Sequence, residues 1–322
     1  MPFTNVIDRS DAAALIPQEV SSEILKNVAE KNPLLRMARR LPNMSRAQRR
    51  MPVMSALATA YFVSGDTGLK QSSEVNWANK YIDAEELAVI VPIPEAVLDD
   101  SEFDIWGEVK PELETAIDIA IFQAVVDGVN IPASWTTNLG AAGLKAGAVA
   151  ASQVVSSAAY TDLYEAILGE TAGGTTGLIG LIEEDGFMAT GHIAHTSMRR
   201  KLRNVRTADG APIFLPSMQV RGQYDLDGSP CEFPLDGSVN PANLLMTGQW
   251  NQLVYSMRQD ISWKILSEAV IQDGAGNIIY NLAQQDMVAL RAVIRLGFAL
   301  PNPINRMNQT AATRFPFAFL TA

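Results

Sequence analysis

Residues 84–106 read AEELAVIVPIPEAVLDDSEFDIW, an almost continuous apolar run that passes into a cluster of acidic side chains. The apolar run is rich in Val and Ile, which fit the pleated surface of a sheet, and it predicts a strand ending in a short turn. Asp99, Asp100 and Ser101 can each accept a hydrogen bond from the first turn of a helix, so they are N-cap candidates. This segment therefore predicts a strand that leads into a helix.

The helix predicted next is long and apolar on most sides. Pro111 falls in its predicted first turn, where a missing backbone N–H costs nothing. One apolar stripe recurs at helical spacing, and neighbouring residues widen it: Leu113, Ile117, Ala120, Ile121 and Ala124, with Ile119, Phe122 and Val126. A helix with this pattern is buried on most sides, and Gly128 suits its C-terminal end.

Upstream of this strand, the sequence predicts a hairpin preceded by an arm. A β-prone run over residues 60–63 meets the polar tip 64–68 and returns through Val75 and Trp77. An extended hairpin has little core of its own, so it needs an outside partner. Residues 1–54 read as an arm with one helix, in which three apolar residues recur four apart: Val20, Ile24 and Val28.

Downstream of the long helix, residues 128–156 are small and rich in Gly and Ala, which indicates a loop or connection. A compact α+β domain follows. Its predicted elements are a helix within 160–171, a strand near 187–196, a helix over 197–210 and two short strands around 216–234. Long strands within 251–272 and 286–303 then return the chain to a sheet.

The composition is that of a folded globular protein. The 322 residues are 48% hydrophobic and 19% charged, enough for two domains or one elaborate domain. A single cysteine, Cys231, excludes a disulfide within the chain and a thiolate metal cluster. No signal peptide is expected, and no apolar run approaches the roughly 18 residues of a membrane span.

The charges are distributed unevenly along the chain. The net charge of −10 argues against a general nucleic-acid binder. Between residues 26 and 50, Glu30 alone opposes a basic series: Lys26, Lys31, Arg36, Arg39, Arg40, Arg46, Arg49 and Arg50. Between 80 and 118 the balance is strongly acidic. Such runs are solvated faces or complementary surfaces between copies, and the Arg-rich, Met-interleaved composition of the arm favours an intermolecular contact over a nucleic-acid contact.

The histidines are the first place to look for catalysis or metal binding. His192 and His195 are the only two in the chain, and Thr196 or Ser197 after them can cap a helix. A strand entering a helix is therefore predicted, and residues three apart on a strand point to opposite faces. The glycine-rich segments match neither phosphate-binding pattern, and Cys231 has no nearby histidine. No catalytic, metal or cofactor site is predicted, and the chain is not expected to be an enzyme.

The order of these elements resembles the major capsid proteins of tailed bacteriophages with the Hong Kong 97 fold. The resemblance runs from about Ile16 to the C-terminus. The segments that carry it are 84–106, MRRKLRNVRTADGAPIFLP at 198–216, DLDGSPCEF at 225–233, and the closing strands at 246–269 and 281–303. It implies an α+β fold with an N-terminal arm (1–54), an extended loop (55–86), a peripheral domain with a long spine helix (87–155 and 256–322) and an axial α+β domain (156–255).

The function that the resemblance implies is structural. Copies would form hexamers and pentamers of an icosahedral head that encloses double-stranded DNA without sequence specificity. The implied location is the virion capsid, assembled in the bacterial host cytoplasm. The expected partners are further copies, a separate scaffolding protein, a portal protein and a decoration protein, with no membrane and no cofactor.

The residues expected at contacts between subunits lie on the arm, the hairpin and the axial domain: Arg36, Arg39, Arg40, Arg46, Arg49, Arg50, Lys70, Glu74, Trp77, Arg199 and Arg200. Some relatives cross-link covalently through a lysine on the extended loop and a neighbour's asparagine. By location alone, Lys70 is the donor candidate here, and the acceptor candidates are Asn302, Asn305 and Asn308.

Two alternatives stay open from the sequence. An encapsulin, a cellular shell with the same fold, would carry a protein cargo in place of DNA. A soluble metal-dependent enzyme would use His192 and His195 as ligands, and loss of stoichiometric zinc on their replacement by alanine would identify it.

Overall fold

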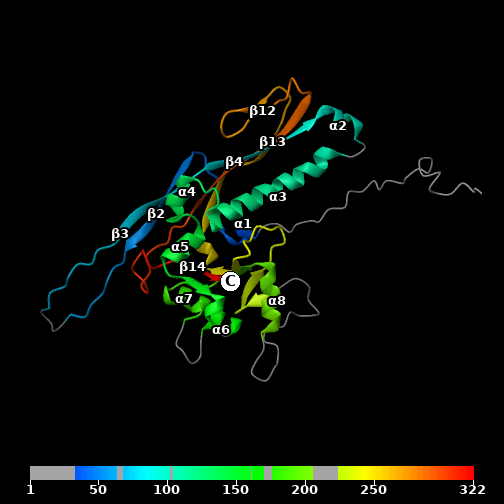
Figure 1. Cartoon of the computed structure of the whole chain (residues 1–322). Helices are drawn as coiled ribbons and strands as arrows, with labels where there is room; N and C mark the ends of the chain where they lie inside the picture. The colour runs from blue at the N-terminus through cyan, green and yellow to red at the C-terminus, as the bar shows by residue number, and fades with distance from the viewer. Residues whose placement is uncertain (1–32, 64–67, 102–103, 161, 170–175, 206–223) are drawn as a thin grey trace, which may run out of the picture.

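Figure 1 shows the computed structural model, which describes residues 33–63, 68–101, 104–160, 162–169, 176–205 and 224–322. The arm helix predicted around residues 20–28 lies outside these ranges. A four-stranded sheet runs through one half of the molecule in the order β1 (Arg39–Arg40), β10 (Val254–Leu266), β13 (Met287–Ala299) and β4 (Glu85–Pro94). Within the described ranges, no helix combines the length and the apolar character of a membrane span.

The apolar run after Ala84 forms β4, antiparallel to β13. The short turn predicted after it is a helix, α2 (Glu95–Asp100). The long helix α3 spans Ile105–Val126, and its N-cap is Asp104, whose side chain accepts a hydrogen bond from the Gly107 N–H at 3.1 Å. The predictions of Asp99, Asp100 or Ser101 as the cap, and of Pro111 in the first turn, are therefore wrong. Pro111 lies inside the helix, where its missing N–H removes one backbone hydrogen bond. The helix continues through this position because the turns on either side keep their hydrogen bonds.

Helix α3 lies along the four-stranded sheet (Figure 1). The predicted stripe is confirmed, since Leu113, Ile117, Ile121 and Ala124 are buried and Ala120 is half-buried. Burial extends around the last two turns through Phe122, Val125 and Val126. Acidic residues occupy the remaining, exposed side of the helix, including Glu112 and Glu114.

The extended hairpin pairs β2 (Gln48–Ala56) with β3 (Asn76–Asp83). The strand predicted at residues 60–63 was wrong, because the paired strands lie nearer the hairpin root. In β2 the half-buried residues Arg49, Met51 and Val53 alternate with exposed ones. This period-2 pattern places Arg49 on the same face as the apolar residues, so the strand shows no alternation of hydrophobic and polar residues in the sequence. The predicted boundary between arm and loop, at residue 54, falls inside β2.

A six-stranded sheet forms the other half, in the order β5 (Val154–Ser156), β14 (Phe317–Thr321), β9 (Asn243–Gly248), β6 (Gly191–Ala194), β8 (Ser229–Glu232) and β7 (Asp225–Leu226). It is accompanied by α6 (Leu163–Leu168), α7 (Leu178–Glu184) and α8 (Thr196–Asn204). Because β14 pairs with β9, the last residues of the chain join the sheet of the predicted axial segment, although 256–322 were grouped with the peripheral segment.

The Gly/Ala-rich connection predicted at 128–156 contains two helices, α4 (Ala133–Leu139) and α5 (Leu144–Ala150). Alanine is the best helix former, and short helices suffice here because tertiary packing holds them. The chain turns at Gly128, Gly140 and Gly143, all with positive φ. A Cβ on Gly143 would lie 2.7 Å from the backbone nitrogen of Gly128, so this close approach requires glycine.

The remaining elements are short: α1 (Leu34–Met37), η1 (Ser157–Ala159), η2 (Trp250–Gln252) and the two-stranded pair β11 (Val270–Gln272) and β12 (Ile278–Asn281). The long closing strands predicted from the sequence are confirmed as β10 and β13.

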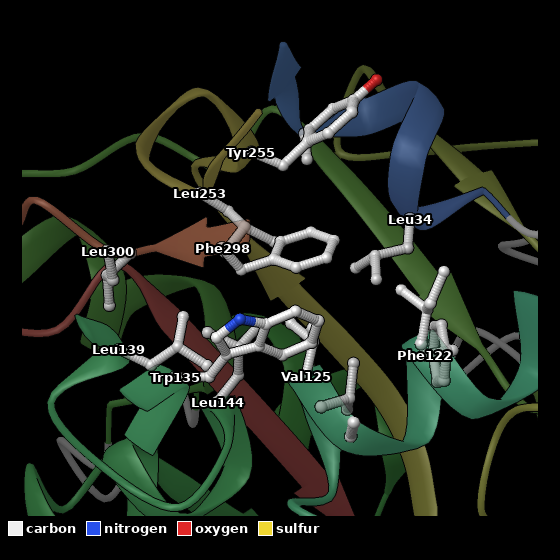
Figure 2. Close-up of a cluster of buried hydrophobic side chains, with 14 of the residues drawn as sticks. Leu34, Phe122, Val125, Trp135, Leu139, Leu144, Leu253, Tyr255, Phe298 and Leu300 are labelled. Atoms are coloured by element: carbon white, nitrogen blue, oxygen red, sulfur yellow. The ribbon is translucent and has the colours of Figure 1, made fainter. Parts of the chain in front are cut away.

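The main hydrophobic core joins α1, α3, α4 and α5 to the ends of β10 and β13 (Figure 2). Trp135 packs edge-on against Phe298 with ring centroids 5.2 Å apart. Its indole N–H donates to the carbonyl oxygen of Asp83, at the end of β3, over 3.1 Å. Leu34 of α1 is also part of this core. The core therefore anchors both the end of the arm and the root of the hairpin.

Candidate assembly surfaces

The hairpin exposes an unusual amount of apolar surface as it projects from the body (Figure 1). Phe62 and Leu69 are fully or almost fully exposed, and Trp77 is 67% exposed. Met54, Tyr61 and Tyr81 add to this surface. Large exposed apolar side chains gathered on one projecting element are typical of a surface that binds a protein partner. The predicted contact residues Lys70 and Glu74 are exposed on the same hairpin.

Some arginines of the arm contact residues of their own chain. Arg36 forms an ion pair with Glu232 of β8 in the same chain. Arg39 and Arg40 form β1, which pairs in parallel with the start of β10. The described end of the arm therefore packs on its own chain through the backbone.

The other arm arginines keep their charges available. Arg49 donates to the carbonyl oxygen of Pro42 over 2.6 Å. Arg39, Arg40, Arg46 and Arg50 are exposed. Between residues that the structure describes, no ion pair joins these five arginines to a carboxylate.

An acidic surface lies on α2 and the first half of α3. Its exposed carboxylates belong to Glu95, Asp99, Asp100, Asp104, Glu112 and Glu114. Like charges on neighbouring elements repel one another unless cations approach. This surface is therefore electrostatically complementary to the arm arginines.

In the axial half, α8 presents Arg199 and Arg200 to solvent. Its N-cap is His195, whose Nδ1 accepts from the Ser197 N–H at 3.2 Å, so the prediction of Thr196 or Ser197 as cap was wrong. The imidazole nitrogen accepts the hydrogen bond that a side-chain oxygen usually accepts at an N-cap. Arg199 lies over the Tyr224 ring, 4.7 Å from its centroid, and donates to the Tyr224 hydroxyl.

The other histidine has a separate structural role. His192 is fully buried in β6, and its Nε2 lies 2.9 Å from the carbonyl oxygen of Leu226. Burial lowers the pKa of His192 to about 4, so the ring is neutral at pH 7. Its register neighbour on β8 is Cys231, whose pKa is raised to about 12 by burial. The two imidazoles thus serve a sheet and a helix cap, and no cluster of three or more metal-ligating side chains forms among the described residues.

The asparagines proposed as cross-link acceptors belong to a buried hydrogen-bond network around Asp185. The Asp185 carboxylate accepts from the side chain of Gln153, from Asn308 Nδ2 at 2.6 Å and from the Phe315 N–H at 2.9 Å. Asn305 Nδ2 donates to the Asp185 carbonyl oxygen at 2.6 Å.

Asn302 extends this network to Arg314. Its amide donates to the Arg314 carbonyl oxygen at 2.8 Å, and its oxygen accepts from Arg314 Nε at 3.1 Å. The sequence pattern alone gives no sign that Asp185 is buried. The missed signal was the single buried position within the acidic run Glu183–Asp185, which only the packing reveals.

Comparisons with known proteins agree with this architecture. Residues 12–305 match the family model described as the phage capsid family. The chain is 26% identical over 298 residues to the "Major capsid protein" of Staphylococcus phage 80alpha, covering 91% of this chain and 83% of that protein.

Solved structures from phages share the whole fold. A chain from Microbacterium phage Oxtober96 is 33% identical with a TM-score of 0.81, covering 98% of this chain and 99% of that one. A chain from Mycobacterium phage Adephagia is 28% identical with a TM-score of 0.79, covering 98% of each. The predicted Hong Kong 97-like α+β fold is confirmed. The chain belongs to the phage capsid family, and its role is that of a structural subunit of a phage capsid.

Proposed function

We propose that copies of this chain assemble as hexamers and pentamers, which close into an icosahedral head around double-stranded DNA. The observation that carries the proposal is the projecting hairpin with Phe62, Leu69 and Trp77 exposed. Burial of one such side chain is worth about 1.5–3 kcal/mol. A neighbouring copy that covers the hairpin supplies the core that the hairpin lacks.

The contact residues follow from the exposed charges. Arg39, Arg40, Arg46, Arg49 and Arg50 face the carboxylates of a neighbour, which steers association and fixes register. Lys70, Glu74 and Trp77 form the hairpin contact. Arg36 contributes less than its arm neighbours, because its charge is already opposed by Glu232.

Around the capsomer axis, Arg200 contacts the adjacent copy, and Arg199 positions Tyr224 beside it. The segments 1–54, 55–86, 87–155 with 256–322, and 156–255 act as arm, extended loop, peripheral domain and axial domain. The pairing of β14 with β9 supports moving residues 317–321 to the axial domain.

The remaining partners follow from this role. A separate scaffolding protein guides assembly in the bacterial cytoplasm, a portal protein occupies one vertex, and a decoration protein binds the outer surface. DNA is enclosed without sequence readout, which suits a chain of net charge −10. The chain acts as a building block and not as an enzyme. The cross-link through Lys70 is not part of the proposal, because the amides of Asn302 and Asn305 are engaged within their own chain.

Expression followed by size-exclusion chromatography and negative-stain microscopy tests this function. Shells or capsomers are expected from the native chain, alone or with its scaffolding protein. Trp77→Ala should lower their yield, whereas Met188→Ala, at an equally exposed position outside the hairpin, should not. A stable monomer that forms no capsomers even with scaffolding protein would refute the proposal.

A further inference from the structure

An open groove of about 570 Å³ lies at the root of the hairpin. Its apolar lining includes Leu41, Met51, Val53 and Met54, together with Val254 at the start of β10. Arg39, Arg49 and Arg50 line the same groove. This combination is suited to an apolar side chain that carries carboxylates beside it.

The groove arginines are positioned to bind an anion. Arg39 and Arg50 are exposed, and no carboxylate of the described residues pairs with them. Arginine is more weakly hydrated than lysine and presents a planar fork to carboxylates, so it is well suited to a desolvated contact.

Helix α2 presents the complementary chemistry. None of its residues is buried, and Val97 is 50% exposed. Glu95, Asp99 and Asp100 are exposed on the same short helix, and Asp100, three residues after Val97, lies on the same face as this valine. No Lys or Arg occurs between residues 81 and 109, so this acidity has no local compensation in the sequence.

The groove and α2 lie at opposite ends of the same sheet. At one end of β13, Ala299 pairs with Val254 of the groove. At its other end, Met287 pairs with Pro94, the residue before α2. A strand spanning 287–299 at about 3.3 Å per residue separates them by about 40 Å. The two surfaces cannot meet within one copy.

We propose that the groove of one copy receives α2 of a second copy, with Val97 against Met54 and with the α2 carboxylates against Arg39 and Arg50. The charge complementarity of the two surfaces selects this occupant. Contact between different surfaces at opposite ends is heterologous and generates a ring when the rotation closes. This inference rests on the proposed capsid function and deepens it by naming the two surfaces.

A cysteine pair tests the contact directly. Met54→Cys combined with Val97→Cys should give, on mild oxidation of assembled capsomers, a ladder of disulfide-linked chains on a denaturing gel. Met188→Cys combined with Val97→Cys is the matched control, since Met188 is exposed outside the groove. The native Cys231 is buried and does not contribute. Assembled capsomers that give no ladder would overturn the inference.

A charge exchange gives an independent reading. Arg39→Glu with Arg50→Glu should lower assembly yield about tenfold at low salt, as should Asp99→Lys with Asp100→Lys. Combining the four changes in one chain should restore assembly. Combining the arginine changes with Glu183→Lys and Glu268→Lys restores the same net charge at other exposed positions and should not.

The outcomes separate the inference from the function on which it rests. A native chain that forms no capsomers contradicts the proposed function. A native chain that assembles, while the four-residue exchange assembles no better than the two-residue variants, contradicts only the groove contact. Should the cysteine variant fail to assemble when reduced, the charge exchange decides alone.

Discussion

Replacing Asp185 by asparagine should destabilise the subunit by about 4 kcal/mol, because it removes the charge from the centre of a buried network. The side chain is 8% exposed. Its carboxylate holds Gln153, Asn308 and the backbone of Phe315 together. Three separate parts of the chain thus depend on one acceptor group.

The magnitude follows from what each partner loses. An amide nitrogen in place of one carboxylate oxygen cannot accept, so at least one buried donor is left unsatisfied at a cost of about 1–3 kcal/mol. Arg314 is 3% exposed; burial lowers its pKa and the Asp185 charge raises it. No ion pair joins Arg314 to Asp185 among the described residues, and Arg314 keeps its acceptors in Asn302 and Asn308. Loss of the Asp185 charge therefore adds less than the about 3–5 kcal/mol of a broken buried ion pair.

Calorimetry of the unassembled subunit measures this effect. The entropy of unfolding is about 2.1 cal/mol/K per residue, or about 0.7 kcal/mol/K for the chain, so 4 kcal/mol lowers Tm by about 6 °C. Glu183→Gln, an exposed neighbour, is the control and should change Tm by less than about 1 °C. A Tm for Asp185→Asn within about 1 °C of the native value would refute the reasoning.

The same variant should loosen the hairpin. The 302–308 segment contacts it through Arg306 Nη2, which donates to the Ala58 carbonyl oxygen at 3.0 Å, and through Ile304 N–H, 3.4 Å from the Met54 carbonyl oxygen. Because Asp185 anchors this segment, limited proteolysis should cut the Asp185→Asn hairpin faster than the native one. Equal cleavage rates would show that the hairpin is held independently of the network.

Three further outcomes are expected. Gly297→Ala should reduce soluble yield sharply, because a Cβ at this position would lie 2.3 Å from the backbone oxygen of Asp83. A variant with a normal Tm would contradict the close packing of β13 against β3. The pKa of His192 is lower in the folded protein than the pKa of a histidine in the unfolded chain. The free energy of unfolding should therefore be constant above about pH 6.5 and fall by about 3 kcal/mol as the pH drops toward 4. A His192→Asn variant with the same pH dependence in urea titrations would exclude this residue as the cause. Assembled shells should run as monomers on denaturing gels, and a ladder lost in Lys70→Arg would reveal the cross-link that the engaged asparagines argue against.

Periodicity carried much of the fold. The stripe of α3 repeats over enough residues to define both the helix and its buried face, and the apolar run of β4 is long enough to define the strand. The two closing strands β10 and β13 are long as well, and their positions were predicted correctly. Such patterns can be recognised in a sequence because the period of a helix or strand determines which side chains share a face.

The misses share a different cause. In β2, arginine takes the half-buried face beside Met51 and Val53, so the alternation is one of burial and not of hydrophobicity. Helices α4 and α5 are short and small-residue-rich, and they exist because Trp135, Leu139 and Leu144 reach a core built by distant strands. Neither pattern has a local signature.

The assembly surfaces were predictable as charge and composition, but not as geometry. The contrast between the arm arginines and the acidic residues near α2 is written in the sequence. Their separation along β13, the burial of Asp185 and the use of His195 as a helix cap depend on contacts between residues far apart in the chain. Local sequence sets which groups are charged or apolar, while tertiary packing alone determines which of them are left facing water, and therefore which are available to a neighbouring copy.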